Sequence, residues 1–256
     1  MTSEKKKLDL SIFDTLKMFA GADKRLHKVW IEKDKIILND PKIRSLMYTP
    51  EAPIFNSDFG ISDLVKFSSM ISLFDDLEIE IDIPNIVMRN SSNSQMMVFR
   101  TSTKPAFEPI IESNTKAKGI HDISYKLEEE GKHLEFELNH EIVSKIGKAS
   151  SILSSGSAVK SIFRIEKDAD CDDIKIIVTN EATENVFTQT VKSNNIGKIG
   201  KFSHSFNSDF ILPGNWKVNV FDEVLNIGGR ELPTVWCHMV DKENGLSLII
   251  VYRNEG

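Results

Sequence analysis

Residues 55–59 read Phe-Asn-Ser-Asp-Phe, and residues 206–210 read Phe-Asn-Ser-Asp-Phe again. An identity of five residues between two distant places is not expected by chance in a chain of 256 residues. Internal repetition is settled first in reading a sequence, because it fixes how many folding units the chain contains. The repeated pentapeptide therefore predicts a duplicated chain.

Three further pairs of similar segments occur in the same order in the two halves. The distance between the copies only grows along the chain, as expected when one ancestral unit was duplicated and the second copy gained loop insertions. The pairs are Leu8-Asp9-Leu10-Ser11 with Phe136-Glu137-Leu138-Asn139, Ile31-Glu32-Lys33-Asp34 with Ile165-Glu166-Lys167-Asp168, and Val98-Phe99-Arg100 with Val251-Tyr252-Arg253. We therefore expect two similar domains, residues 1–104 and 121–256, joined by residues 105–120.

Each half shows the same alternation of helical and extended patterns. Residues 10–20 and 61–74 carry apolar side chains at helical spacing, and residues 142–153 do so in the second half. The clearest strand is residues 78–83, where acidic residues alternate with isoleucines. A weaker helix is expected near residues 206–212, where Pro213 cuts it short. Each half therefore indicates helix, strands, helix and strands.

Residues 103–120 lack this regularity. Pro105, Pro109 and Gly119 interrupt the segment, and Pro and Gly are the strongest breakers of regular structure. Phe107 and Ile110 are apolar for a linker. We expect an extended connector between the domains; an ordinary linker whose apolar residues pack locally is the simpler interpretation.

Charge is distributed unevenly along the sequence. The net charge of −6, taken alone, argues against a protein that binds nucleic acid. Basic residues are concentrated at 5–35 and 192–217, whereas acidic residues crowd at 75–82, 128–130 and 168–173. An acidic body with local basic elements can steer DNA to one surface and repel it from the others. Charged faces that merely meet water are the competing interpretation.

No catalytic or metal-binding pattern stands out. Cys171 and Cys237 have no partner motif, which suits a reducing cytosol, and the six histidines have no ligand spacing. Nucleophile-elbow, zinc-protease and phosphate-loop motifs are absent. We therefore expect neither an enzyme nor a metal or cofactor site.

The sequence shows no sign of export or of membrane insertion. No apolar run approaches the roughly 20 residues that span a bilayer. The polar N-terminal residues are not followed by a long apolar stretch, so no secretory signal is expected. We expect a cytoplasmic protein without a membrane partner.

Four stretches resemble the DNA sliding clamps, and specifically the clamp of large tailed bacteriophages. They are residues 10–19 (LSIFDTLKMF), residues 58–75 with the strand 77–83 after them, residues 214–220 (GNWKVNV) and residues 246–252. The resemblance covers most of the chain at low identity. It implies an α+β clamp fold of two similar domains, each of two βαβββ units, with helices inside and sheets outside. Three such subunits close into a ring of six domains.

The resemblance also implies a function. A clamp encircles duplex DNA and tethers the replicative polymerase to the template, which gives processivity without reading bases. The implied partners are DNA polymerase, the ATP-driven clamp loader and, in such phages, late-transcription factors; no cofactor is implied. A viral clamp acts in the cytoplasm of the infected host cell. Lysines on the lining would meet phosphates, and the candidates are Lys5, Lys7, Lys17, Lys66, Lys145, Lys148, Lys198 and Lys201.

Two further surfaces follow from the resemblance. Edge strands of neighbouring subunits would pair, residues 95–101 of one with residues 185–191 of the next. The interface candidates are Gln95, Val98, Thr101, Val186, Thr188 and Val191. Partner proteins would dock a short peptide in an apolar pocket beneath the connector, for which the candidates are Leu46, Phe107, Ile110 and Tyr252. Ordinary core packing is the competing interpretation for these four.

Two other classes of protein remain open. A duplicated β-rich virion structural or assembly protein would not encircle DNA and would not gather lysines on its helices. A nucleic-acid enzyme with an unrecognised site would have a deep pocket with converging carboxylates or histidines.

Overall fold

The computed structural model describes residues 12–21, 24–40, 44–53, 55–90, 92, 94–155, 161–180, 182, 185–207, 212–227 and 230–252. The chain has an α+β architecture and divides into two compact units. Unit 1 comprises Met1–Asp40 and Met47–Lys116, and unit 2 comprises Pro41–Leu46 and Ala117–Gly256. Strand β3 (Arg44–Tyr48) contributes residues to both units.

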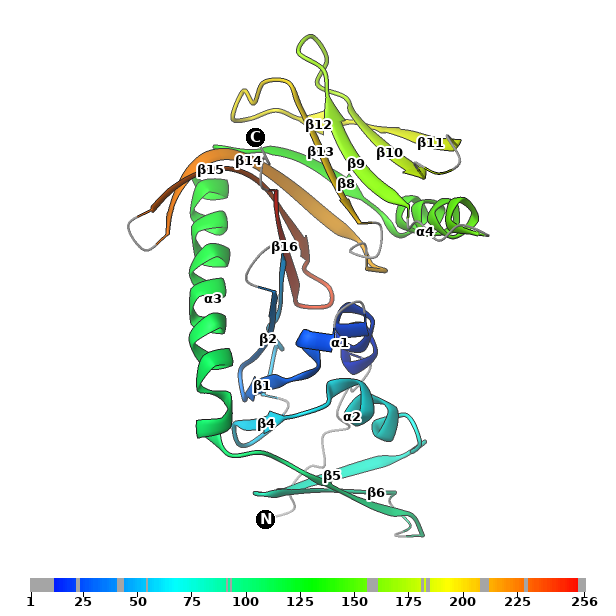
Figure 1. Cartoon of the computed structure of the whole chain (residues 1–256), viewed down its shortest axis with the longest axis vertical. Coiled ribbons are helices and arrows are strands. Elements are labelled where there is room, and N and C mark those ends of the chain that lie inside the picture. Colours follow the sequence, from blue (N-terminus) through cyan, green and yellow to red (C-terminus); the bar gives the residue numbers. More distant parts are fainter. Residues whose placement is uncertain are drawn as a thin grey trace. The chain divides into compact units, whose positions relative to one another are not determined.

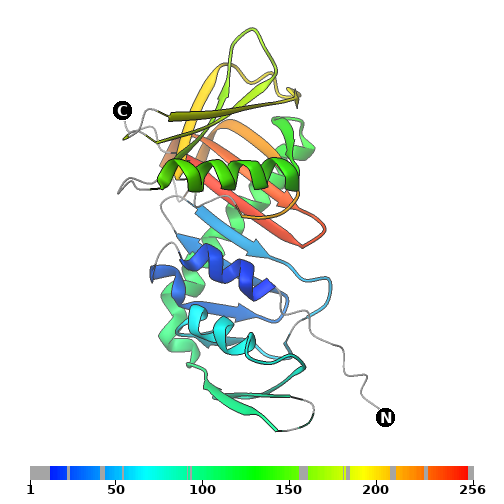
Figure 2. The ribbon, with the colours of Figure 1, turned by 90° about the vertical axis from the view of Figure 1, so that its right-hand side faces the viewer.

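Unit 1 combines two helices with short antiparallel sheets. Its helices are α1 (Ile12–Gly21) and α2 (Leu64–Ile71), and the 3-10 turn η1 (Lys24–His27) follows α1. Its strands are β1 (Val29–Glu32), β2 (Lys35–Asp40), β4 (Phe59–Ile61), β5 (Leu77–Asp82), β6 (Asn85–Asn90) and β7 (Met96–Arg100). They pair in the orders β2–β1–β4 and β5–β6–β7. Helices α1 and α2 lie side by side on one face of these strands (Figure 2).

The two helices of unit 1 bury the faces that their apolar spacing predicts. Phe13 of α1 packs edge-on against Phe67 of α2, with 5.3 Å between ring centroids, and Phe67 meets Phe99 of β7 at 5.1 Å. Asp63 caps α2, because its side chain accepts a hydrogen bond of 2.9 Å from the Lys66 N–H. This packing and capping fix α2 so that the Lys66 side chain remains exposed.

A long helix occupies most of the segment expected to be an extended connector. The 3-10 turn η2 (Lys104–Phe107) leads into α3 (Glu108–Glu129), a helix of 22 residues. Pro109 lies in the first turn, where its missing N–H breaks no helical hydrogen bond. The expectation of an extended segment at 105–120 is therefore wrong. Among the described helices, none is long and apolar enough to cross a membrane.

Hydrogen bonds attach α3 to the strands of each unit. In unit 1, Asn39 Nδ2 of β2 donates to the Ser113 backbone oxygen at 3.2 Å and to Ser113 Oγ at 2.8 Å. In unit 2, His121 Nδ1 lies 2.6 Å from Ser247 Oγ, and His121 Nε2 lies 3.2 Å from Ser45 Oγ. Polar contacts therefore help to hold the buried side of α3 in both units.

Unit 2 has two antiparallel sheets. Its strands are β8 (Leu134–Leu138), β9 (Ile162–Lys167), β10 (Ile174–Asn180), β11 (Asn185–Val191), β12 (Ser193–Asn194), β13 (Phe202–Asn207), β14 (Trp216–Ile227), β15 (Arg230–Asp241) and β16 (Leu246–Tyr252). One sheet has the order β12–β8–β14–β15–β16–β3, and the other has the order β11–β10–β9–β13. Helix α4 (His140–Ser154) follows β8 and packs against β10. Helices α3 and α4 lie on opposite sides of the strands of this unit (Figure 1).

An aromatic cluster joins α3 to the first sheet of unit 2. Phe221 and Trp236 are stacked with ring centroids 5.1 Å apart, and both are almost fully buried. The Trp236 indole N–H donates to Ser124 Oγ of α3 at 2.9 Å, so the buried polar group has a partner. The apolar residues that complete the cluster are Ile249, Val251, Ile120, Ile123 and Leu127.

The weak helix expected near residues 206–212 is not seen in the described part of that segment. Phe206 and Asn207 end β13, where they pair with Phe163 and Ile162 of β9. Residues 208–211 lie outside the described residues, and Leu212 is not helical. Strand pairing to β9 extends β13 over the start of the predicted helix, so the prediction is wrong there.

Candidate nucleic-acid interface

The helices of unit 1 carry two of the predicted DNA-facing lysines. Lys66 of α2 is exposed, and Lys17 of α1 is half-buried. The Lys17 ammonium donates to Ser69 Oγ of α2 at 3.0 Å, which links the two helices. Lys5 and Lys7 lie outside the described residues. In unit 1, therefore, the Lys66 ammonium is exposed to water, whereas the Lys17 ammonium is hydrogen-bonded to the Ser69 hydroxyl.

The exposed side of α4 carries another pair. Asn139 caps this helix, because its side chain accepts a hydrogen bond of 2.9 Å from the Ile142 N–H. Lys145 pairs with Glu141 one turn earlier at 2.6 Å. Lys148 is exposed one turn further on. The two lysines therefore share a surface, on which the Glu141 carboxylate offsets part of the positive charge.

Lys198 and Lys201 are not brought to α4. They lie in the β12–β13 connection, where the Gly197 N–H donates to the His133 backbone oxygen at 2.8 Å. His133 immediately precedes β8, whereas α4 follows the other end of this strand. A strand of 5 residues spans roughly 17 Å, so this loop and the start of α4 are well separated.

One sheet edge in each unit carries exposed apolar side chains. Among the described strands, β7 and β11 each have a neighbour on one side only. Met96 and Val98 of β7 are 69% and 51% exposed, and Val186 of β11 is 60% exposed. An unpaired edge of this kind is a template for pairing with another strand. By contrast, the opposite edge β5 presents acidic side chains, Glu80 and Asp82, and charge discourages such pairing.

The predicted interface residues divide between the surface and the core. The exposed ones are Gln95, Val98, Val186 and Thr188, and the buried ones are Thr101 and Val191. The Thr101 N–H donates to the Pro84 carbonyl at 2.7 Å, which ties the end of β7 to the β5–β6 turn. Met96 is the most exposed apolar side chain of β7, and sequence reasoning missed it. Its alternation with Val98 along the strand was the available signal.

Two of the four candidates for a peptide pocket are core residues. Leu46 and Phe107 are 0% and 1% exposed. The Phe107 ring lies so close to Gly60 that a Cβ there would be 2.5 Å from the ring. Ile110 is half-buried, and the side chain of Tyr252 is outside the described residues. Leu46 and Phe107 offer no exposed apolar surface, which agrees with ordinary core packing for these two.

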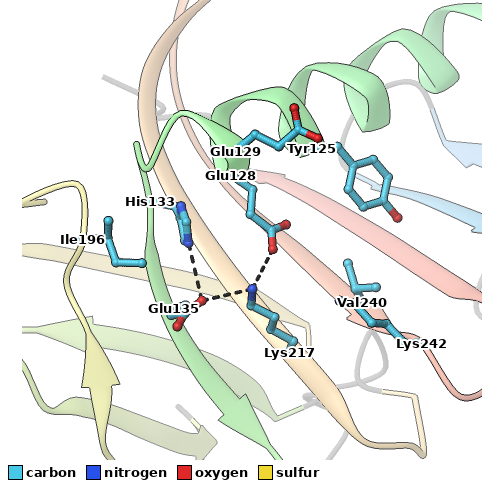
Figure 3. A pocket seen from close by; sticks show the side chains of 9 residues that line it. All are labelled: Tyr125, Glu128, Glu129, His133, Glu135, Ile196, Lys217, Val240 and Lys242. Atoms are coloured by element: carbon cyan, nitrogen blue, oxygen red, sulfur yellow. Dashed lines mark hydrogen bonds and ion pairs between the residues drawn. The ribbon is translucent and has the colours of Figure 1, made fainter.

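Sequence reasoning also missed a charged cluster where α3 meets the first sheet of unit 2 (Figure 3). Lys217 Nζ of β14 lies 2.6 Å from a Glu128 oxygen of α3 and 3.0 Å from a Glu135 oxygen of β8. Burial alone would lower the pKa of Lys217, but hydrogen bonds to the two carboxylates raise it above its ordinary value. The hydrogen bond from Lys217 lowers the pKa of Glu135. These residues come from three separate elements, α3, β8 and β14, so no local sequence pattern predicts the cluster.

Two buried histidines, His121 of α3 and His238 of β15, contact the same serine. His121 and His238 both reach Ser247 Oγ, at 2.6 Å and 2.8 Å respectively. Burial lowers the pKa of His121 to about 3 and that of His238 to about 4. Both imidazoles are therefore neutral at physiological pH. Within the described ranges, no group of three or more His, Cys, Asp or Glu residues is placed to hold a metal ion.

The combination of few helices with many antiparallel sheets is the fold of the DNA sliding clamps. The chain is similar to the solved structure of DNA polymerase III subunit beta from Borrelia burgdorferi, with a TM-score of 0.58 and 11% identity over 100% of this chain and 66% of that chain. It is also similar to the beta subunit from DNA polymerase of Streptococcus pyogenes, with a TM-score of 0.55 and 11% identity over 99% of this chain and 67% of that chain.

A third similar structure has nearly the same length. Proliferating Cellular Nuclear Antigen from Entamoeba histolytica matches with a TM-score of 0.53 and 11% identity, over 96% of this chain and 94% of that chain. Among the bacterial beta subunits, coverage of their own length ranges from 63% to 69%, so the chain spans about two thirds of them. No protein-family model and no curated protein sequence matches the chain. At these identities the likeness establishes the fold.

Proposed function

We propose that this protein is a sliding clamp that encircles duplex DNA and tethers the replicative polymerase to the template. The observation that carries the proposal is the pair of apolar strand edges, β7 in unit 1 and β11 in unit 2, in a chain with the clamp fold. Two different adhesive edges on one chain favour head-to-tail joining of identical copies, and head-to-tail contacts form a ring when the rotation closes.

Pairing of β7 with β11 of the next copy would remove both unpaired edges. Val98 and Val186 would leave water, as would Met96. Gln95 and Thr188 are exposed polar residues on the same two segments and would flank the apolar contact. Thr101 and Val191 are buried within their own units, so the strand pairing between copies would end near these two residues. Backbone hydrogen bonds between the strands would add to the apolar burial.

Chain length supports three copies in the ring. The chain covers 94% of Proliferating Cellular Nuclear Antigen from Entamoeba histolytica but 66% of the longer Borrelia burgdorferi beta subunit. With two units per chain, three chains make a ring of six units, the number that the resemblance to sliding clamps implies. We therefore propose a homotrimer.

Lysines would give the ring a weak hold on DNA that ignores sequence. Ammonium groups meet phosphates without reading base edges, and such contacts weaken as salt rises. The pairing of Lys145 with Glu141 and of Lys17 with Ser69 would keep each contact weak, so that the ring can slide. The lysines proposed for this surface are Lys17, Lys66, Lys145 and Lys148, with Lys5, Lys7, Lys198 and Lys201 as further candidates.

The other partners are proposed from the resemblance alone. A clamp loader driven by ATP would open and place the ring, and late-transcription factors would bind it in a large tailed bacteriophage. The protein would then act in the cytoplasm of the infected host cell. Residues 105–120 would serve as the connector between domains 1–104 and 121–256, in helical form. Ile110 and Tyr252 remain candidates for a peptide site, whereas Leu46 and Phe107 are core residues.

Native mass tests ring formation first. Sedimentation equilibrium should give three times the chain mass of 29.0 kDa. The ring is then loaded onto nicked circular DNA by its clamp loader and passed through a gel-filtration column. It should stay with the circle, leave after the circle is cut, and stay again when the cut ends are blocked. A monomer, or equal retention on circular and open linear DNA, would contradict the proposal.

A further inference from the structure

We propose that a cavity at the end of α3 binds an arginine side chain of a partner protein. The cavity has a volume of about 390 Å³ and is lined from α3, β8, β14 and β15 of unit 2 (Figure 3). Ligand-binding sites typically have volumes of about 300–1,000 Å³. The proposal goes beyond DNA encirclement and is tested without DNA, so the two can fail separately.

Carboxylates outnumber ammonium groups around the cavity. Glu128, Glu129 and Glu135 line it, together with Lys217 and Lys242. Lys217 lies between Glu128 and Glu135, at 2.6 and 3.0 Å, so one ammonium is shared by two carboxylates. Within the described residues Glu129 has no ion pair, and Figure 3 shows its side chain near Tyr125. The site therefore has a net negative charge that a cation would neutralise.

The end of helix α3 adds to this negative potential. The Lys132 N–H bonds to the Leu127 carbonyl at 2.9 Å and the Gly131 N–H bonds to the Glu128 carbonyl at 3.0 Å. With the positive φ of 69° at Gly131, this is a Schellman termination. The C-terminal end of a helix carries partial negative charge, which favours cations. The sharp turn at Gly131 also brings His133 to the cavity wall.

His133 is a buried imidazole whose Nε2 faces the Glu135 carboxylate (Figure 3). Its side chain is 3% exposed, and neither ring nitrogen has a hydrogen-bond partner among the described residues. The closest carboxylate oxygen, of Glu135, lies 3.5 Å from Nε2, beyond the usual range for such a bond. The imidazole therefore forms part of the polar wall of the cavity next to Glu135.

A guanidinium matches these groups better than an ammonium or a phosphate. It has five N–H donors in a planar fork, which can bond two carboxylates together. The ring of Tyr125, 37% exposed, lines the same cavity and can stack on the guanidinium. Val240 can pack against the methylene stem. Three carboxylates would repel a DNA phosphate, so the ligand is a protein segment that exposes arginine.

Methyl groups in the cavity report binding directly. Ile196 and Val240 line the cavity, and their methyl resonances can be followed in the full chain labelled at Ile and Val. Titration with N-acetyl-arginine amide should shift both resonances and reach saturation. N-acetyl-citrulline amide has nearly the same shape without the charge and should not shift them. N-acetyl-lysine amide should bind more weakly than the arginine compound.

Two substitutions at the rim should change the affinity in opposite directions. Glu129→Gln should weaken binding of N-acetyl-arginine amide about fivefold, and Lys242→Gln should strengthen it, because each changes the local charge by one unit. Glu112→Gln, on an exposed part of the same helix, is the matched control and should leave binding unchanged. The proposal is overturned if arginine amide causes no saturable shift, if citrulline amide binds equally well, or if Glu129→Gln binds like the unsubstituted chain.

Discussion

The Lys217 ammonium on β14 lies 2.6 Å from a Glu128 oxygen near the end of α3, and this contact joins the helix to the sheet. The other Glu128 oxygen accepts a hydrogen bond from Asn219 Nδ2 at 2.9 Å. The side chains of Lys217 and Glu128 are 33% and 21% exposed. A partly buried carboxylate that satisfies two donors is a point where a single substitution should loosen the end of the helix.

Replacing Glu128 should therefore destabilise unit 2. Glu128→Ala leaves Lys217 and Asn219 without one acceptor each, and we expect a loss of about 1–3 kcal/mol in the free energy of unfolding. Urea unfolding followed by circular dichroism measures it. The control is Glu112→Ala, which breaks an exposed pair with Lys116 of 2.7 Å on the same helix; exposed pairs contribute little, so no measurable change is expected. Equal losses from the two substitutions would contradict the role given to Glu128.

A charge on either apolar edge should prevent ring formation. Val98→Glu and Val186→Glu each place a carboxylate where the proposed strand pairing would bury it, and we expect association at least about tenfold weaker. Sedimentation velocity at micromolar concentration should show the trimer replaced by the single chain. Leu73→Glu is the matched control, because Leu73 is 63% exposed but lies outside β7 and β11. A trimer that survives both edge substitutions would show that other surfaces join the subunits.

The lysines of α4 should set part of the salt dependence of DNA binding. Replacing Lys145 and Lys148 by Ala should weaken binding to a short duplex and reduce the slope of log K against log salt by about 1–2. Fluorescence anisotropy over a salt series measures the slope. Replacing Lys198 and Lys201 should have a smaller effect, because they lie at the other end of β8. Lys116→Ala on α3 serves as the control; a larger loss from it than from the α4 pair would contradict the placement.

Stability should fall in mild acid because two histidines are buried as neutral groups. His121 and His238 have pKa values of about 3 and about 4 in the folded chain, against about 6.5 when unfolded. Below pH about 6.5 the unfolded state binds protons that the folded state excludes. The free energy of unfolding should be constant above that pH and fall below it, by up to about 1.4 kcal/mol per pH unit for each histidine.

Urea titrations at a series of pH values measure this decline. His238→Asn should reduce the slope, because one of the two proton-binding groups is removed. His140→Gln should not, because His140 is exposed. A free energy of unfolding that stays flat between pH about 7 and about 5 would show that the two imidazoles bind protons as readily in the folded chain as in the unfolded one.

The duplication remains a prediction, and the segments on which it rests differ in where they lie along the elements. Ile31 and Ile165 both lie in the first strand after a helix, β1 and β9, so that pair of segments marks equivalent places. The two pentapeptides do not, because Phe55 lies before the start of β4 whereas its counterpart Phe206 lies near the end of β13. The order of helices and strands is therefore a better guide to the repeat than local identity.

Helix α3 was missed because its buried side is polar. Four residues of α3 are buried at helical spacing, namely Asn114, Ala117, His121 and Ser124. Only Ala117 is apolar, so this side of the helix has no apolar periodicity that would predict it. Its prolines and glycine then suggested a break. The charged cluster and the His133 cavity depend on this helix, so they could not be foreseen either.

The lysines of the candidate interface were easier to place. Lys17, Lys66 and Lys145 each lie off an apolar stripe that the sequence shows clearly, so their helices and their exposed faces follow from spacing. Which strands form edges depends instead on pairing order across the whole unit. The alternation of Met96 with Val98 indicates that the two share one face of β7, but that this strand is a sheet edge could not be read from the sequence.

The unpaired edges β7 and β11 make a single copy of this chain prone to aggregation. Before another copy binds, Met96, Val98 and Val186 are exposed to water. An unrelated extended peptide can then pair with either edge. Dilution separates the subunits and exposes these edges, so it should promote aggregation. Most aggregating proteins show the reverse and aggregate less when they are diluted. Assembly of the subunits would protect the chain from aggregation by covering both edges. Proteolytic fragments that keep one edge and lose the other would be the most prone to aggregate.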